Sequence, residues 1–379
     1  MNKRLIFFES CMRGHEHIPI NDALIKIFSG IYLNYSIVLI GEKKHINILK
    51  SLNNNVLKLH SVFNIPYKLF LISIYDIISS LYAFLVLFLV KSDDILVVTN
   101  RLPITHIIIK FLNLFFVRKI FFICHGEMEA FTNSKSLGNT KYYFYLNKFA
   151  FLIKNKSVNY ILLGNQILPN LINLKIKDHL IFIDHPYDYN FNNVNDNFKG
   201  NLINLVHVGR GTLSKDSQLI FKLAGILKKE IDNSKISLSI SGRVDINLLK
   251  YDNGLVKYYK GNDFVSPVEF ENSILMAKYV VFFLSKDVYL ATPSGSFFDA
   301  IKYEKPIIAL KGNSFLDDYF KRFGNIGYLC DNINSMKEII LLNINNDEMY
   351  KSQVENVKKM KESLKNENIK NNLYKQIDL

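Results

Sequence analysis

The stretch HVGRGTLSKD, residues 207–216, joins the end of an apolar run to a glycine-rich turn. The apolar run reads as a buried strand, and a helical pattern follows the turn. Gly209 and Gly211 would let the backbone approach a ligand, while Arg210 and Lys215 would supply charges that suit a diphosphate. The alternative is a plain connection with a capped helix and two solvated cations. In either case, a strand, a polar turn and a helix in this order predict part of a parallel α/β sheet.

The same alternation of short apolar runs and helical patterns extends along most of the chain. Such runs are typical of parallel strands covered on both faces. A polar, Asn-rich stretch interrupts them, so we expect an α/β protein with two Rossmann-like parallel-sheet domains. The predicted parts are a first domain over 1–186, a linker over 187–200, a second domain over 201–362 and a helical tail over 363–379. The expected strands are Leu5–Glu9, Ser36–Ile40, Val56–Leu59, Ile95–Thr99, Ile120–Cys124, Tyr160–Leu163, Leu180–Ile183, Leu202–Val208, Ile236–Ser241, Val256–Tyr259, Tyr279–Leu284, Ile307–Leu310 and Gly327–Cys330.

Composition restricts the class of partner. The chain has 379 residues and a formal net charge of +13, which favours nucleic acid, an anionic membrane surface or a phosphorylated ligand. Its aromatic residues lie within apolar runs and do not alternate with Lys or Arg, which argues against nucleic-acid binding. The cysteines form no CxxC pair and the histidines do not cluster with other ligand types, so we predict no metal site.

An apolar segment, Leu69–Val90, is long enough to span a bilayer. Its one charged residue, Asp76, would be costly near the centre of a span. We therefore expect a helix packed on the sheet, with one face buried or resting on lipid. A true membrane span is the alternative.

A second turn, ATPSGS over residues 291–296, precedes another helical pattern. Open α/β sheets bind ligands at the carboxyl ends of their strands, so this turn should lie at the same sheet edge as Lys215. Hydroxyls and backbone N–H groups at a helix N-terminus hold anions well. Asp299 could accept hydrogen bonds from ribose hydroxyls, or it could form an ordinary capping box with Ser296. The predicted diphosphate-binding residues of this turn are Thr292, Ser294, Gly295 and Ser296.

Loops after the strands of the first domain supply candidates for an acceptor side. His125 and Glu127 follow a buried strand, where an imidazole and a carboxylate could activate an acceptor hydroxyl. His15, in the loop after the first strand, is a further catalytic candidate. For each of them the alternative is an ordinary hydrogen-bonded loop residue. The other acceptor-side candidates are Arg13, Glu16 and Arg101.

These motifs resemble the donor-binding domain of GT-B glycosyltransferases, in particular the family-4-like enzymes that build bacterial surface polysaccharides. Arg210 and Lys215 match the family's GR…K turn in residue type and spacing. Asp299–Ala309 resembles the second half of the family's E-x7-E-A-x-x-x-x-x-P-[VI]-[VI]-A pattern. His125-Gly126 matches a His-Gly that members often carry. The resemblance covers roughly residues 200–330 well and is looser over 1–185.

The chain departs from the family pattern at three positions. Asp299 replaces the second Glu, and Lys305 replaces a Gly that usually precedes the final Pro. Ala291 stands where the family has its first Glu, which lies beside the donor sugar. Thr292 or the 294–296 turn would have to take over that contact.

The resemblance implies two domains facing across a cleft, and transfer of a sugar from a nucleotide-diphosphate sugar to an acceptor hydroxyl. It implies no cofactor and no metal, because Arg, Lys and helix N–H groups can neutralise the leaving diphosphate. The expected acceptor is a lipid-linked oligosaccharide of O-antigen or capsule assembly. The expected location is cytoplasmic, peripheral on the anionic inner face of the cytoplasmic membrane. The alternatives are a non-catalytic GT-B-like subunit of a transferase complex, which Ala291 favours, and a basic nucleic-acid-binding protein.

Overall fold

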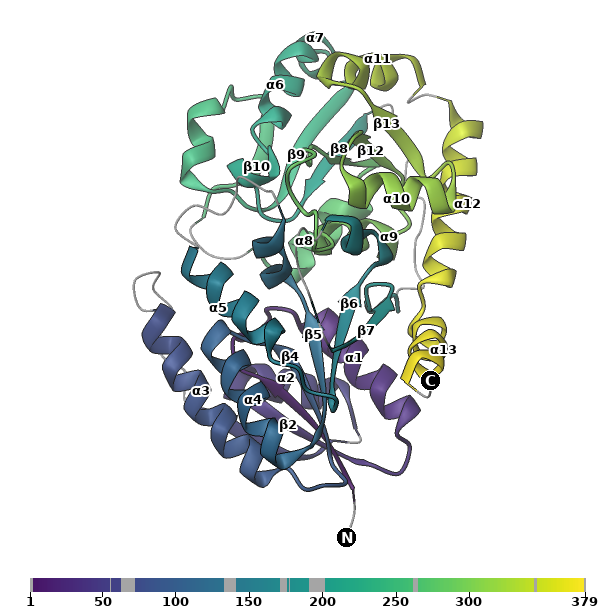
Figure 1. Cartoon of the computed structure of the whole chain (residues 1–379). Coiled ribbons are helices and arrows are strands. Elements are labelled where there is room, and N and C mark those ends of the chain that lie inside the picture. The colour runs from purple at the N-terminus through teal and green to yellow at the C-terminus, as the bar shows by residue number, and fades with distance from the viewer. Residues whose placement is uncertain are drawn as a thin grey trace. The chain divides into compact units, whose positions relative to one another are not determined.

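The computed structural model describes residues 3–54, 56–62, 72–132, 141–170, 176, 178–190, 202–261, 265–343 and 346–377. The chain forms two compact units, each built on its own parallel sheet (Figure 1). Most of the predicted linker, 191–200, lies outside the described residues. The first unit comprises Met1–Asp188, Ala291–Pro293 and Leu364–Leu379, and the second comprises Tyr189–Leu290 and Ser294–Ser363.

The first unit contains a seven-stranded sheet with the order β3-β2-β1-β4-β5-β6-β7. All neighbouring strands are parallel, which fits helical crossovers on both faces. The strands are β1 (Arg4–Glu9), β2 (Ser36–Glu42), β3 (Val56–Val62), β4 (Ile95–Asn100), β5 (Lys119–Cys124), β6 (Val158–Leu163) and β7 (His179–Ile183). The helices are α1 (Ile18–Ile31), α2 (Lys43–Leu52), α3 (Ile72–Leu89), α4 (Pro103–Phe116), α5 (Lys141–Leu152) and α13 (Asn366–Ile377), with short 3-10 turns η2 (Gly126–Phe131) and η3 (Asn165–Asn170).

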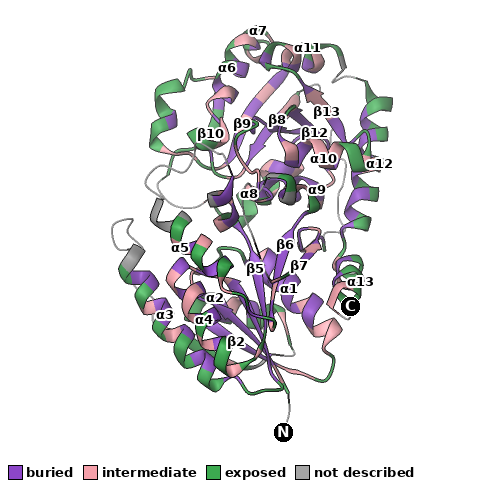
Figure 2. Cartoon of the chain, viewed as in Figure 1, coloured by how far each residue is buried: buried purple, intermediate pink, exposed green. Residues whose placement is uncertain are grey.

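The strands of this sheet are apolar on both sides. Leu5 and Phe7 of β1 belong to the core beneath α1, α2 and α13. Ile6 and Phe8 belong to the core beneath α3, α4 and α5. Successive side chains of a strand point to opposite faces, so a sheet covered on both faces needs continuous apolar runs. The buried strands in Figure 2 correspond to the runs predicted from the sequence.

The second unit contains a six-stranded parallel sheet with the order β10-β9-β8-β11-β12-β13. The helical pattern that follows the 207–216 turn forms a helix only from Leu219, after Asp216, which has a left-handed φ of 52°. The strands are β8 (Ile203–Val208), β9 (Ile236–Arg243), β10 (Val256–Tyr259), β11 (Tyr279–Phe282), β12 (Ile307–Leu310) and β13 (Gly327–Cys330). The helices are α6 (Leu219–Ile226), α7 (Lys228–Asp232), α8 (Pro267–Leu275), α9 (Gly295–Lys302), α10 (Ser314–Phe323), α11 (Ile333–Asn343) and α12 (Asp347–Ser363), with 3-10 turns η4 (Leu213–Lys215) and η5 (Ile246–Tyr251).

The last helix, α13, packs on the first sheet. Its Ile369 and Leu373 enter the core shared with α1. The Gln376 amide lies against β7, the last strand of that sheet: its Oε1 accepts from the Phe182 N–H at 3.0 Å and its Nε2 donates to the Phe182 carbonyl at 2.7 Å. One side chain therefore bonds the sheet edge as a further strand would.

Helix α3 accounts for most of the apolar segment expected over 69–90, and residues 69–71 lie outside the described chain. Asp76 is fully buried and accepts from the Ile104 and Thr105 N–H groups at 2.8 and 3.0 Å. It caps the first turn of α4, whose N-cap Leu102 makes no side-chain capping bond. Helix α3 packs on the sheet as predicted. No helix among the described residues is long and apolar enough to cross a membrane.

Candidate active site

The turn after β8 meets the first turn of α9. Gly209 has a positive φ of 92°, and a Cβ at this position would overlap the Ser296 Oγ and lie 3.6 Å from the Lys215 Nζ. A glycine is therefore needed for the Ser296 side chain to approach the end of this strand, where the Lys215 ammonium also lies. The structure brings these three predicted residues together.

The glycines of this turn have a different role from the predicted one. The Gly209 N–H donates to the Ser241 carbonyl at 2.8 Å, and the Gly211 N–H donates to the Arg243 carbonyl at 2.9 Å. Both bonds continue the pairing with β9, so these two N–H groups are not available to a phosphate. Gly209 serves by its lack of a side chain.

The surroundings of Lys215 favour an anion. Its Nζ lies 5.7 Å from the centroid of the Tyr289 ring, and no carboxylate of the described residues forms an ion pair with it. Helix α9 begins beside it, and the first turn of that helix contains no acidic residue. The N-cap Ser294 is buried, and its side chain makes no capping hydrogen bond. An ammonium and the positive end of a helix therefore meet at one point.

Asp299 lies one turn further into α9. The predicted capping box between Ser296 and Asp299 does not form, because the N-cap is Ser294. Gly295, the first residue of the helix, is exposed, and no atom would lie within 4 Å of a Cβ added to it. A side chain at this position would meet open space.

Arg210 is paired with a carboxylate. Its Nε donates to the Asp245 Oδ1 at 2.7 Å, and its Nη2 lies 2.6 Å from the same oxygen. The pair is exposed and contributes little to stability. Of the two predicted cations, Lys215 is the one without a carboxylate partner in the described chain.

A buried histidine, His207, holds the turn in place through hydrogen bonds. The His207 Nδ1 lies 3.0 Å from the Val281 carbonyl, and its Nε2 lies 3.0 Å from the Ser217 Oγ. The same hydroxyl accepts from the Thr212 N–H at 3.1 Å. Burial lowers the pKa of His207 to about 4, so the ring is neutral near pH 7 and can link both partners. The sequence analysis did not select His207, although a histidine within an apolar run is a usable signal.

Thr292 makes its contact within the first unit. Its Oγ1 donates to the His125 carbonyl at 3.1 Å. The neighbouring Ala291 is fully buried, and its N–H donates to the Glu129 Oε1 at 2.7 Å. Residues 291–293 thus pack in the first unit, and the role of Thr292 as a diphosphate ligand stays a prediction.

His125 has the properties of a neutral base. The ring is buried, hydrogen-bonds the Thr99 backbone, and leaves its Nε2 without a partner in the described chain. Burial holds the pKa of His125 well below its usual value, and the nearby His17, His185 and Arg101 lower it further. The His17 ring, which the sequence analysis did not select, lies 5.1 Å away between centroids.

Glu127 is engaged in holding the loop. It lies 3.0 Å from the Nη1 of the fully buried Arg101 and accepts from the His125 N–H at 3.0 Å. Burial raises the pKa of Glu127, and the Arg101 charge opposes that rise. Arg101 also stacks over the Phe122 ring, 4.4 Å from its centroid. Glu127 therefore links the buried Arg101 to the backbone of His125.

The loop after β1 uses its predicted residues to hold its own shape. Glu16 accepts from the Arg13 N–H at 3.2 Å, and the Arg13 guanidinium lies 5.4 Å from the Tyr75 ring centroid. His15 is exposed. Glu9, which was not predicted, accepts from the N–H groups that follow it and from the Thr99 hydroxyl at 2.8 Å.

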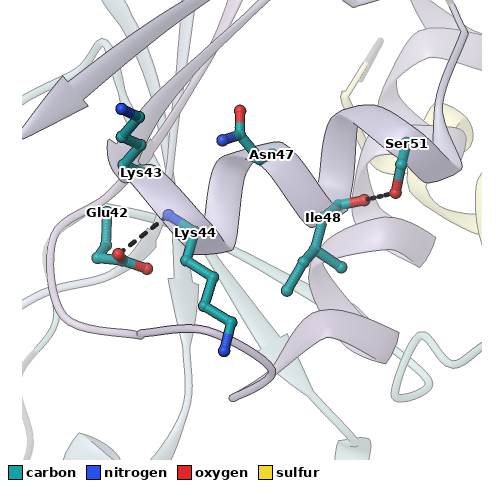
Figure 3. Close-up of a pocket in the computed structure, with 6 residues that line it drawn as sticks. All are labelled: Glu42, Lys43, Lys44, Asn47, Ile48 and Ser51. Carbon is teal, nitrogen blue, oxygen red and sulfur yellow. Dashed lines mark hydrogen bonds between the residues drawn. The ribbon is translucent and has the colours of Figure 1, made fainter.

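Glu42 joins this loop to α2. It accepts from the N–H groups of Lys44, His45 and Gly14 at 3.0, 2.8 and 3.1 Å. Burial alone would raise the pKa of Glu42, but these donors outweigh it and lower the pKa. A hollow of about 500 Å³ lies along this helix (Figure 3), lined by Glu42, Lys43, Lys44, Asn47, Ile48 and Ser51.

The described residues contain no group of three or more His, Cys, Asp or Glu side chains arranged to hold a metal ion.

Solved structures with the same architecture span nearly the whole chain. Anabaena Alr3699/HepE in complex with UDP matches with a TM-score of 0.68 at 11% identity, over 99% of each chain. Sucrose-phosphate synthase from Thermosynechococcus elongatus gives 0.69 at 11% identity over 99% of each chain. WaaG, a glycosyltransferase involved in lipopolysaccharide biosynthesis, gives 0.63 at 11% identity over 98% of each. No protein-family model and no curated protein matches the sequence. The chain has the GT-B fold.

Proposed function

We propose that this protein is a glycosyltransferase that moves a sugar from a nucleotide-diphosphate sugar to an acceptor hydroxyl. The observation that carries the proposal is the meeting of Lys215 with the uncapped N-terminus of α9, made possible by Gly209. The solved proteins with this fold include one described in complex with UDP and with UDP-glucose. A diphosphate is the ligand that best fits an ammonium beside free helix N–H groups.

The proposed reaction breaks the bond between the sugar's anomeric carbon and the β-phosphate oxygen. The acceptor oxygen forms the new bond to that carbon and loses its proton. Negative charge grows on the leaving diphosphate, where Lys215 and the α9 N–H groups act more strongly than on the intact donor. The partnerless Nε2 of His125 is the base proposed to take the acceptor proton. Asp299 is proposed to bind the donor ribose or sugar.

The proposed acceptor is a lipid-linked oligosaccharide of O-antigen or capsule assembly, used at the inner face of the cytoplasmic membrane. The net charge of +13 supports attraction to an anionic surface. We propose that neither a cofactor nor a metal takes part, because Lys215 and the helix end already face the diphosphate position.

Thermal unfolding with nucleoside diphosphates tests the donor site. A ligand that binds only the native state raises the melting temperature. We expect one nucleoside diphosphate to do so for the wild type and for Lys257→Ala, an exposed lysine of β10, but not for Lys215→Ala. If no nucleoside diphosphate shifts the folded wild type, the proposal fails and a non-catalytic subunit is the better assignment.

The rate of sugar transfer from donor to acceptor tests the proposed role of His125 as the base. His125→Ala should keep the nucleotide-induced shift, because the proposed diphosphate ligands, Lys215 and the α9 N–H groups, belong to the second unit. The transfer rate should fall by about 10²–10⁴, the usual contribution of a general base. An unchanged rate would remove His125 from the mechanism and leave the donor site in place.

A further inference from the structure

Helix α3 presents an apolar face to the outside as well as to the sheet. Ala83, Val86 and Leu87 are buried in the core. Between residues 74 and 89, every exposed residue is also large and apolar. A surface helix of a soluble protein normally carries charged and polar residues on its outer side. The exposed residues are Ile74, Ile77, Leu81, Phe84, Leu85, Phe88 and Leu89.

The two neighbouring helices continue this face. Helix α4 packs against α3, and α5 packs against α4 (Figures 1 and 2). The exposed residues of α4 are Phe111, Leu114 and Phe115, and the exposed residues described on α5 are Tyr145, Phe149 and Leu152. Phe115 is 73% exposed and Phe88 is 59% exposed. None of the exposed residues described on these three helices is charged. We call this set of exposed residues of α3, α4 and α5 the apolar face.

Cations gather at one end of the apolar face. The helices that connect parallel strands on one face of a sheet all run in the same direction. The segments that follow α3, α4 and α5 therefore lie at the same edge of the sheet. Asp93 is the one exposed carboxylate in those segments, since Asp94 is buried in a pair with Arg4. The cations are Lys91 after α3, Arg118 after α4, and Lys154 and Lys156 after α5.

We propose that the apolar face is the surface on which this protein binds an anionic lipid bilayer. Large apolar side chains would enter the boundary between headgroups and acyl chains, and the cations would meet the lipid phosphates. A protein partner fits less well, because protein interfaces carry about one hydrogen bond per 100–200 Å² and the apolar face offers almost no polar side chain. The proposal specifies the membrane contact of the proposed function, but it does not require glycosyl transfer.

A single tryptophan can report the contact, because the chain contains no Trp. Phe88→Trp places it on the apolar face. Leu52→Trp is the matched control, because Leu52 is 50% exposed at the end of α2 on the other side of the same sheet. Vesicles of phosphatidylcholine with phosphatidylglycerol should shift the emission of Phe88→Trp to the blue, and brominated lipids should quench it. Leu52→Trp should show neither effect. Equal responses of the two variants, or no response of either, would overturn the proposal.

Flotation of the full chain with the same vesicles tests which residues contribute to vesicle binding. Leu81→Gln/Leu85→Gln/Phe88→Gln should reduce vesicle binding at least about tenfold, since each side chain loses an apolar transfer. The control Ile246→Gln/Val268→Gln/Leu342→Gln changes exposed apolar residues of the second unit and should bind as the wild type does. Lys154→Glu/Lys156→Glu should lose the preference for anionic over pure phosphatidylcholine vesicles.

Light scattering without lipid tests whether a second copy of this chain, instead of a bilayer, covers the apolar face. A concentration-dependent dimer that the triple Gln variant abolishes would assign the apolar face to a second copy of this chain and overturn the proposal. All these measurements are made without donor. Failure to bind vesicles is thus distinguishable from failure to bind nucleotide.

Discussion

Helix α2 covers one face of the first sheet, and helix α3 covers the other. Their inner sides are alike: Ile46 and Leu49 of α2 and Val86 and Leu87 of α3 are buried against strands. Their outer sides differ. Helix α2 exposes Lys43, Lys44, Asn47, Lys50 and Ser51, with Leu52 at its end (Figures 2 and 3), whereas the exposed residues described on α3 are all apolar.

This difference shows that packing on the sheet does not explain the composition of α3. One apolar stripe is enough to attach a helix to a sheet, as α2 demonstrates. A second apolar stripe, on the outer side of a helix, lowers solubility unless another surface covers it. The outer residues of α3 are therefore best explained by what lies outside the protein, and the inner residues by the fold.

The largest effect should separate a leucine of the core from a leucine of the apolar face. Leu373 of α13 is fully buried, and Leu373→Ala should lower the free energy of unfolding by about 2–5 kcal/mol through lost burial and a cavity. Leu85→Ala should change it by less than about 0.5 kcal/mol, because Leu85 is 57% exposed. Urea unfolding of the two variants measures both values. A similar loss in both would mean that the apolar face is part of the core.

Asp76 should give the next largest effect. It is the polar residue that fixes α3 to the start of α4, through two N–H groups and the Thr105 hydroxyl at 3.1 Å. Asp76→Ala would leave those donors buried without an acceptor and should cost about 2–3 kcal/mol. Asp76→Asn keeps one acceptor oxygen and should cost less. Equal costs in urea unfolding would show that shape, not hydrogen bonding, holds this contact.

Acid should weaken the side of the sheet that carries the apolar face. His106 of α4 is fully buried, and burial, aided by the charges of Arg101 and Lys110, lowers its pKa well below the usual value. The unfolded chain then binds a proton near pH 6.5 that the folded chain refuses, so stability falls as the pH drops below about 6.5. The loss should grow steadily as the pH falls from about 6.5 towards 5. His106→Gln should unfold with a smaller difference between pH 7.5 and pH 5, and an unchanged difference would assign the effect to other groups.

Most strands and the two-sheet architecture could be predicted from the sequence, because a doubly covered parallel sheet needs continuous apolar runs. The helices were harder to predict. Helix α2 was not predicted, because KKHINILKSL is short and mostly polar and its cap, Glu42, precedes it as the last residue of a strand. The late start of the helix after the 207–216 turn depends on the left-handed conformation of Asp216, which the residue type permits but does not require.

Within the candidate site, the meeting of Lys215 and Ser296 could be predicted, because the carboxyl ends of neighbouring parallel strands share one edge. The partners of Arg210 and Thr292 could not. Arg210 bonds Asp245, 35 residues away, and Thr292 bonds the His125 carbonyl, 167 residues away. Such pairings depend on loop conformations that apolar periodicity does not encode.

The smallest expected effect concerns the edge of the sheet rather than its faces. Gln376 satisfies the N–H and the carbonyl of Phe182 on β7. Water can replace much of this bonding at an edge, so Gln376→Ala should cost only about 1 kcal/mol in urea unfolding. Hydrogen exchange should nevertheless speed up at the Phe182 amide, because its protection comes from this one side chain. Asn372→Ala is a suitable control, since Asn372 contacts Gln376 at 2.8 Å without touching the strand through any described bond. Equal protection of Phe182 in wild type and Gln376→Ala would mean that α13 covers this edge by packing alone.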